Sequence, residues 1–117
     1  MNFSDYQKQA ATTDTFGDKE VNDLLASDPA YVAKILGLVG EAGEVAEKYK
    51  KIIRDKKSVI SSSDKEDLKK ELGDVLWYVA LLAKYLGEDL ETIASLNLKK
   101  LSSRHSRGTI HGKGDNR

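Results

Sequence analysis

The chain has 117 residues, which is enough for one domain with a single core. Its 19 basic and 19 acidic residues give a formal net charge of +0. There is thus no overall basic field of the kind that attracts proteins to nucleic-acid polymers, and we expect no such partner. Cysteine is absent, which excludes disulfides and thiolate metal ligands. Together with an N-terminus that lacks signal-peptide features, this favours the reducing cytoplasm.

Membrane association is not expected either. The longest apolar run covers residues 75–83, whereas a helix needs about 20 apolar residues to cross a bilayer. Apolar residues recur at helical spacing through most of the chain, without the period-two alternation of strands. The sequence therefore predicts an all-α protein.

The first predicted elements are a short helix over residues 4–13 and a long helix over residues 28–53. Asp28 suits the N-cap of the long helix, and Pro29 suits its first position because proline has no amide hydrogen to satisfy. The apolar stripe predicted for this helix consists of Ile35, Leu38, Val39, Ala42, Val45, Ala46, Tyr49, Ile52 and Ile53.

The next helix is predicted over residues 63–86. Ser63 and Glu66 match a capping box at its start, and Gly87 suits the C′ position after its end. Apolar side chains cover nearly its whole circumference: Leu68, Leu72, Val75, Leu76, Val79, Leu82, Ala83 and Leu86, joined by Trp77, Tyr78, Leu81 and Tyr85. A helix of this kind is buried all round, and one small chain has too few helices to cover it. We therefore expect a homodimer or a dimer of dimers, with this helix at the interface.

A third core helix is predicted over residues 89–104, so that residues 1–104 form one helical domain. Its inward face is predicted to contain Leu90, Ile93, Ala94 and Leu101. The remaining residues, 105–117, are basic, contain three glycines and show no apolar periodicity. We predict that they form a flexible tail.

Two pairs of acidic residues carry the chemistry. Glu41 and Glu44 are three residues apart on the first long helix, and Glu71 and Asp74 repeat that spacing on the next. Residues three apart share a helix face, so antiparallel helices could bring both pairs together across a groove. Such an all-oxygen cage suits Mg²⁺, with Mn²⁺ as a substitute.

Two other interpretations of the acidic pairs compete with a magnesium site. A single Glu-x-x-Glu pair is most often a solvated surface feature, so the acidic pairs could instead decorate a helical dimerisation module without enzymatic activity. A ferritin-like di-iron centre would require Glu-x-x-His motifs. That centre is set aside because the two histidines, His105 and His111, both lie in the tail.

Polar residues near these helices suggest phosphate ligands. Asn97 is predicted in the middle of the third helix's inward face, with Lys100 and Arg104 at its edge, and Lys48 is predicted on the same side as Glu44. Taken singly, each has an ordinary structural explanation: a hydrogen-bonded amide, snorkelling cations, or a salt bridge from Glu44 to Lys48. Together they favour a bound polyphosphate.

Three sequence runs resemble one family. Residues 40–47 read Gly-Glu-Ala-Gly-Glu-Val-Ala-Glu, residues 70–78 read Lys-Glu-Leu-Gly-Asp-Val-Leu-Trp-Tyr, and residues 97–101 read Asn-Leu-Lys-Lys-Leu. Over about residues 28–108, the chain is similar to the MazG-like all-α nucleotide pyrophosphohydrolases, whose superfamily includes dimeric dUTPases and dCTP pyrophosphatases. The resemblance implies an oligomeric helical bundle and Mg²⁺-dependent cleavage of a nucleoside triphosphate to the monophosphate and pyrophosphate.

The resemblance also assigns residues. The family's catalytic metal ligands correspond to Glu41, Glu44, Glu71 and Asp74, and its nucleotide contacts to Tyr78, Asn97 and Lys100. One position departs from the pattern, because many members have a glutamate where this chain has Gly40. A water-activating role for that glutamate therefore cannot be transferred, and the residues do not select a base or a sugar.

Overall fold

The computed structural model describes residues 1–16 and 24–117. Their regular structure is entirely helical, which confirms the all-α prediction. The helices are α1 (Phe3–Ala11), α2 (Pro29–Asp55), α3 (Ser62–Tyr85) and α4 (Leu90–Ser106). Among the described helices, none combines the length and the apolar character needed to cross a membrane.

α2 begins and α3 ends where the sequence predicts. The Asp28 side chain accepts a hydrogen bond from the amide of Ala30 at 2.9 Å, and Pro29 occupies the first turn. After α3, Gly87 has a φ of +74°, the left-handed conformation that glycine adopts without strain at C′. Both predicted helix ends are confirmed.

The predicted capping box of α3 is wrong by two residues. The N-cap is Ser61, whose hydroxyl accepts from the amide of Asp64 at 3.1 Å, while the Asp64 carboxylate accepts from the Ser61 amide at 2.9 Å. Three consecutive serines offer competing starts, and the acidic partner three residues after Ser61 is Asp64, which also pairs with Lys56 at 2.5 Å. Hydrogen bonds from Lys56 and Ser61 lower the pKa of Asp64 to about 2.

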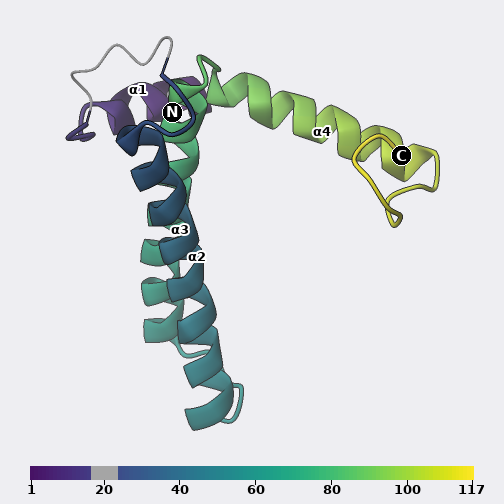
Figure 1. Cartoon of the computed structure of the whole chain (residues 1–117). Coiled ribbons are helices and arrows are strands. Elements are labelled where there is room, and N and C mark those ends of the chain that lie inside the picture. Colours follow the sequence, from purple (N-terminus) through teal and green to yellow (C-terminus); the bar gives the residue numbers. More distant parts are fainter. Residues whose placement is uncertain (17–23) are drawn as a thin grey trace.

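α2 and α3 form a long antiparallel hairpin (Figure 1). Successive contacts across it join Tyr31 to Tyr85, Gly37 to Tyr78, Glu41 to Glu71, Lys48 to Glu71, and Lys56 to Asp64. At Gly37 a side-chain carbon would collide with the Tyr78 ring. The Tyr78 ring can therefore lie directly against α2 in this position because residue 37 is glycine.

The face of α2 that meets α3 is unexpectedly polar. It carries Lys34, Glu41 and Lys48 between the buried residues Ala30 and Ile52. Other apolar residues form an exposed stripe on α2, with exposures of 41–66%: Val32, Ile35, Leu36, Val39, Tyr49 and Ile53. Within one chain, most of the predicted core stripe of α2 is thus open, because the charged residues take the side facing α3.

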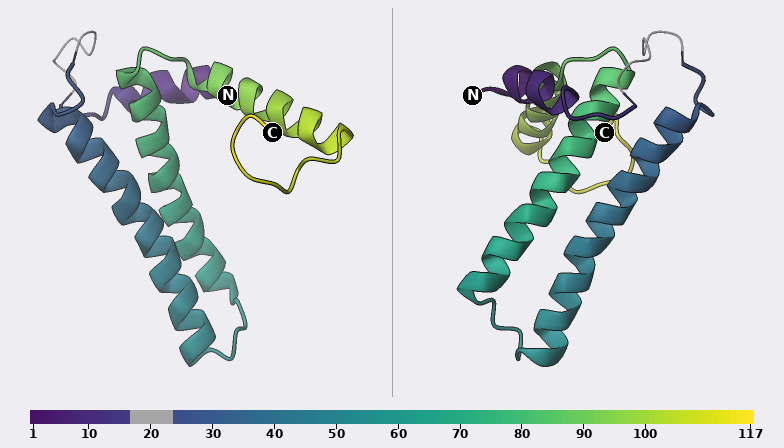
Figure 2. Two further views of the ribbon diagram at one scale, coloured as in Figure 1. Left: turned by 45° about the vertical axis from the view of Figure 1, so that its right-hand side comes forward. Right: turned by 90° about the vertical axis from the view of Figure 1, so that its left-hand side faces the viewer.

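α1 fixes the point where α4 leaves the hairpin. The Gln7 amide donates to the carbonyls of Ala80 at 3.2 Å and Glu88 at 3.0 Å, and its oxygen accepts from the Leu90 amide at 3.1 Å. From there α4 extends sideways (Figures 1 and 2) and contacts α1 and α3 but not α2. Asn97 is consequently exposed. Of the inward face predicted for α4, Leu90 is buried and Ala94 is half-buried, whereas Ile93 and Leu101 are exposed.

The described core is small for a chain of this length. It is centred on Ala10, Ala80, Ala83 and Leu90, with Tyr6, Trp77 and Val79 packed against them. The radius of gyration is 17.2 Å, compared with about 13 Å for a compact domain of this size. The accessible surface is 8360 Å², against about 6300 Å² for a compact monomer of the same mass. The single chain therefore leaves much apolar surface without a partner.

A buried ion pair ties the segment after α1 to the hairpin. Lys34 Nζ lies 2.8 Å from Asp14 Oδ1, and their side chains are 4% and 0% exposed. The Tyr85 hydroxyl donates to the other Asp14 oxygen. The ammonium group also lies over the rings of Phe16, Trp77 and Tyr85, at 4.8–5.5 Å from their centroids. Burial alone would raise the pKa of Asp14, but the hydrogen bonds from Lys34 and Tyr85 outweigh it and hold the pKa below its ordinary value.

We predict that Lys34→Met destabilises the protein by about 3–5 kcal/mol at pH 7, because it leaves a buried carboxylate without its cation. The free energy of unfolding from denaturant titration measures this. The lowered pKa of Asp14 means that its stabilisation is present above about pH 4 and is lost as the pH falls through the folded-state value. The difference in unfolding free energy between wild type and Lys34→Met should therefore decrease as the pH is lowered.

The matched control for this substitution is Lys50→Met. Lys50 lies on the same helix, and its side chain is 61% exposed in an ion pair with Glu47. Such surface pairs contribute about 0.5 kcal/mol or less. Equal losses in the two variants would contradict a special role for the buried pair.

Candidate metal centre

Three carboxylates meet across the hairpin. Glu41 projects from α2, and Glu71 and Asp74 project from the same face of α3. One oxygen of each lies within 4.8 Å of the others. Glu41 and Glu71 are half-buried, and Asp74 is exposed. The antiparallel register thus brings together residues from two different helices.

Glu44 lies outside this three-residue cluster. It is exposed and lies one turn further along α2, so its role as a fourth ligand stays a prediction. Its charge still acts on the cluster. Burial raises the pKa of Glu41, and repulsion from Asp74, Glu71 and Glu44 raises it further. The site therefore concentrates negative charge that a cation would relieve.

The donor set fits a hard divalent cation. All three clustered groups offer carboxylate oxygens, the ligands that Mg²⁺ and Mn²⁺ prefer over nitrogen or sulfur. An all-carboxylate set is poorly matched to softer metals. The residues present are thus suited to the cation that the sequence predicts.

Lys48 balances part of this charge. Its Nζ lies 3.3 Å from Glu71 Oε1, and its side chain is 33% exposed. Lys48 therefore pairs across the hairpin with Glu71. Among the described ion pairs, it does not form the alternative pair with Glu44 along α2. Lys48 lies at the edge of the carboxylate cluster with part of its side chain accessible.

Aromatic residues of α3 surround the crossing of the two helices. Tyr78 packs on Gly37, and its ring meets Trp77 edge to face with centroids 4.8 Å apart. Trp77 packs against the core, and its indole N–H donates to Thr13 at 2.8 Å. This is the packing role expected for Trp77. Tyr78 is half-buried beside the hairpin, and its contact with a nucleotide stays a prediction.

One residue near the cluster was not expected from the sequence. Burial raises the pKa of Tyr6 on α1, and the negative charge of Asp74 raises it further. This interaction depends on the packing of α1 on α3, which residue spacing in the sequence does not predict.

The predicted phosphate ligands of α4 lie apart from the carboxylates. Lys100 is half-buried and Arg104 is 4% exposed. Because α4 has no contact with α2, one chain does not bring these cations to Glu41. Instead, both bind Asp115 of the C-terminal segment. Asp115 was missed by the sequence analysis, although it is the single acidic residue among residues 92–117.

Comparison with protein families matches residues 31–109 to the MazG nucleotide pyrophosphohydrolase domain. The chain belongs to this family. It is also 58% identical over 82 residues to the Gene 37 protein of Mycobacterium phage L5, an alignment that spans 70% of this chain and 72% of that protein. No solved structure matches.

Some features of the fold lie inside the range matched to the MazG domain, and others lie outside it. The acidic residues of the hairpin and the cations of α4 fall within the matched range, whereas α1 and residues 110–117 fall outside it. The carboxylate cluster is thus part of the MazG domain, and the last residues of the C-terminal segment are an addition to it.

Proposed function

We propose that the chain hydrolyses a nucleoside triphosphate to the monophosphate and pyrophosphate, using Mg²⁺ held by Glu41, Glu71 and Asp74, with Glu44 as a fourth ligand. The observation that supports this most strongly is the carboxylate cluster across the hairpin, in a chain of the MazG family. Mn²⁺ has the same preference for oxygen and could replace Mg²⁺.

The chain's own residues have separate tasks in this proposal. The clustered carboxylates orient the metal, which when bound supplies Lewis-acid activation of phosphate oxygens and water. Lys100 and Arg104 neutralise the departing pyrophosphate, and Lys48 contacts phosphate, a role supported by its position 3.3 Å from Glu71. Tyr78 and Asn97 contact the nucleotide.

A second copy completes the site in this proposal. The aliphatic stripe of α2 is exposed, and α4 does not touch α2 within one chain. A homodimer or a dimer of dimers would cover the stripe and could bring α4 of one copy to the carboxylates of another.

Hydrolysis should release pyrophosphate, because the proposed cleavage is between the α and β phosphates. A panel of canonical and damaged ribo- and deoxyribonucleoside triphosphates with Mg²⁺, assayed for both products, tests this. Orthophosphate as the first product would reject the assignment. Failure to hydrolyse any triphosphate would favour a dimerisation module without enzymatic activity.

The protein should sediment as a dimer or larger at micromolar concentration, because the exposed stripe needs apolar cover. Leu36 is 66% exposed on the open apolar side of α2, and Leu36→Glu should shift the protein toward monomer by placing a charge there. Lys65→Glu, at an exposed polar position of α3, is the control and should leave the mass unchanged. A monomeric wild type would exclude the proposed assembly.

Asp74→Asn should separate stability from activity. It keeps the side chain's shape and removes one of the mutually repelling charges, so the metal-free variant should melt no lower than metal-free wild type. It should also lose much of the Mg²⁺-dependent stabilisation, since the metal binds the folded cluster and not the unfolded chain. Activity should fall by at least about 10- to 100-fold, the loss typical of a weakened metal site.

Asp67→Asn is the matched control for Asp74→Asn. It makes the same change on the same helix at an exposed residue that pairs with Lys70 at 3.4 Å. It should alter neither the Mg²⁺ shift nor the activity. Thermal melts with chelator and with Mg²⁺, alongside a pyrophosphate assay, compare the variants. Full activity and an unchanged Mg²⁺ shift in Asp74→Asn would show that Asp74 is not a ligand.

A further inference from the structure

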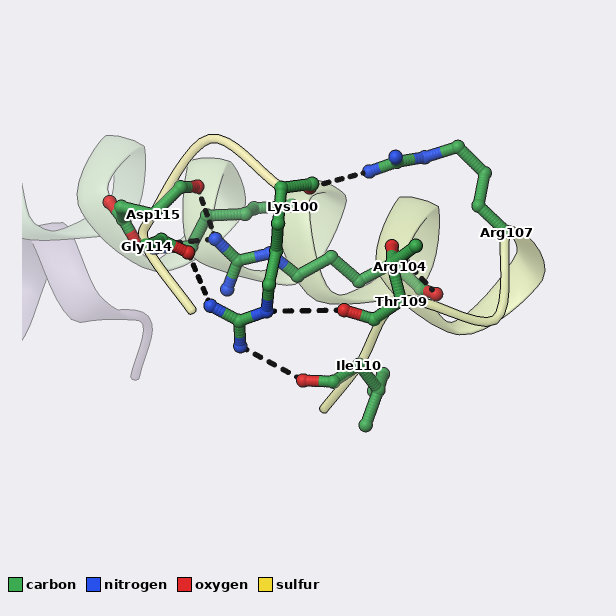
Figure 3. Close-up of polar contacts among 8 residues, drawn as sticks. Lys100, Arg104, Arg107, Thr109, Ile110, Gly114 and Asp115 are labelled. Atoms are coloured by element: carbon green, nitrogen blue, oxygen red, sulfur yellow. Dashed lines mark hydrogen bonds and ion pairs between the residues drawn. The ribbon is translucent and has the colours of Figure 1, made fainter. Parts of the chain in front are cut away.

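The C-terminal segment folds back along α4 and inserts an acidic side chain between two cations (Figures 2 and 3). Asp115 Oδ1 lies 3.0 Å from Lys100 Nζ and 3.2 Å from Arg104 Nη2. Arg104 also donates to the main-chain carbonyl of Asp115. These two cations are the ones proposed above to bind the departing pyrophosphate.

Further hydrogen bonds close the segment into a loop, residues 107–117, which we call the clasp. The Arg117 guanidinium donates to the carbonyls of Thr109 at 3.2 Å, Ile110 at 2.9 Å and Gly114 (Figure 3). Arg107 donates in turn to the Arg117 carbonyl at 3.0 Å. Arg117 is therefore the main anchor of the clasp, and Asp115 is the residue that the anchor positions.

The clasp leaves Arg104 incompletely satisfied. Its side chain is 5% exposed, and within the described part of the chain its Nε is buried without a hydrogen-bond partner. A guanidinium has five donors, and an orphaned buried donor costs free energy. An anion with more oxygens than one carboxylate could engage donors that Asp115 leaves unused.

Asp115 is open to competition from anions in solution. Its side chain is 78% exposed, and hydrogen bonds from Lys100 and Arg104 hold its pKa below the ordinary value, so it is charged at neutral pH. It is also outnumbered. Residues 99–117 contain this one acidic side chain and the six basic residues Lys99, Lys100, Arg104, Arg107, Lys113 and Arg117. A more highly charged anion would be drawn to the same place.

We propose that Asp115 is an internal competitor for the phosphate site. In the closed clasp it occupies Lys100 and Arg104, and the polyphosphate of a nucleotide, or free pyrophosphate, displaces it and opens the clasp. This inference rests on the proposed function in assigning those cations to phosphate. The clasp is thus an autoinhibitory contact that the substrate's own anionic group relieves.

Calorimetric titration of the full chain with inorganic pyrophosphate, in chelator at about 0.15 M salt, tests the competition without hydrolysis. Asp115→Asn should lower the Kd about tenfold by removing the competitor, a change of about 1.4 kcal/mol. This variant also adds net positive charge, which could tighten binding nonspecifically. Glu66→Gln, at an exposed residue paired with Lys69 near the start of α3, makes the same change in charge. It should leave the Kd unchanged, because salt screens the interaction between exposed charges beyond about 8 Å.

Arg117→Gln is the discriminating variant. It removes a positive charge, so simple attraction predicts weaker pyrophosphate binding. It also removes the three anchoring hydrogen bonds, so release of the clasp predicts tighter binding. Lys100→Gln should weaken binding, which shows that pyrophosphate occupies this site.

A Kd that is unchanged or raised in Arg117→Gln, or unaffected by Lys100→Gln, would overturn the clasp even if triphosphate hydrolysis were demonstrated. Conversely, the clasp would stand and the proposed function would fail if the Kd values followed the expected order while no triphosphate was hydrolysed. Far-UV circular dichroism confirms that each variant is folded before titration.

Discussion

The register of α2 on α3 is the constraint on which the rest of the structure depends. The same antiparallel alignment places Lys34 beside Tyr85, Gly37 beneath Tyr78, and Glu41 opposite Glu71. A slip of one helical turn would break all of these contacts together. The close approach at Gly37 and the pairings on either side of it therefore hold the carboxylates in place, so that the stability of the hairpin and the geometry of the candidate site have one origin.

This register leaves apolar surface of α2 exposed in the single chain. Charged residues take the inner face of α2, and the aliphatic residues of the same helix are left on the outside. The clustered acids of the hairpin also repel one another. Apolar cover from another copy and a cation at the cluster would each supply a stabilisation that the chain lacks alone.

The sequence was informative where local rules decide the outcome. Asp28 with Pro29, and Gly87, fix helix ends through hydrogen bonding and backbone conformation within a few residues. The spacing of the acidic pairs likewise anticipated that Glu41, Glu71 and Asp74 would meet. The sequence did not reveal which face of α2 meets α3, because an apolar stripe shows that a face prefers burial but not whether the same chain buries it. Lys34 and Asp115 were missed since their partners depend on tertiary contacts that have no spacing rule.

In this structure an internal ion pair offsets part of the charge in each half of the proposed site. Lys48 lies against Glu71 at the acidic cluster, and Asp115 lies against Lys100 and Arg104 at the basic one. Each of these ion pairs must break before an external ion can bind all the charged groups of that half of the site. A metal that binds Glu71 frees Lys48 for phosphate, and a polyphosphate that displaces Asp115 brings oxygens that can also coordinate the metal. Under the two proposals made above, the two ligands therefore favour each other's binding, and this coupling is reciprocal.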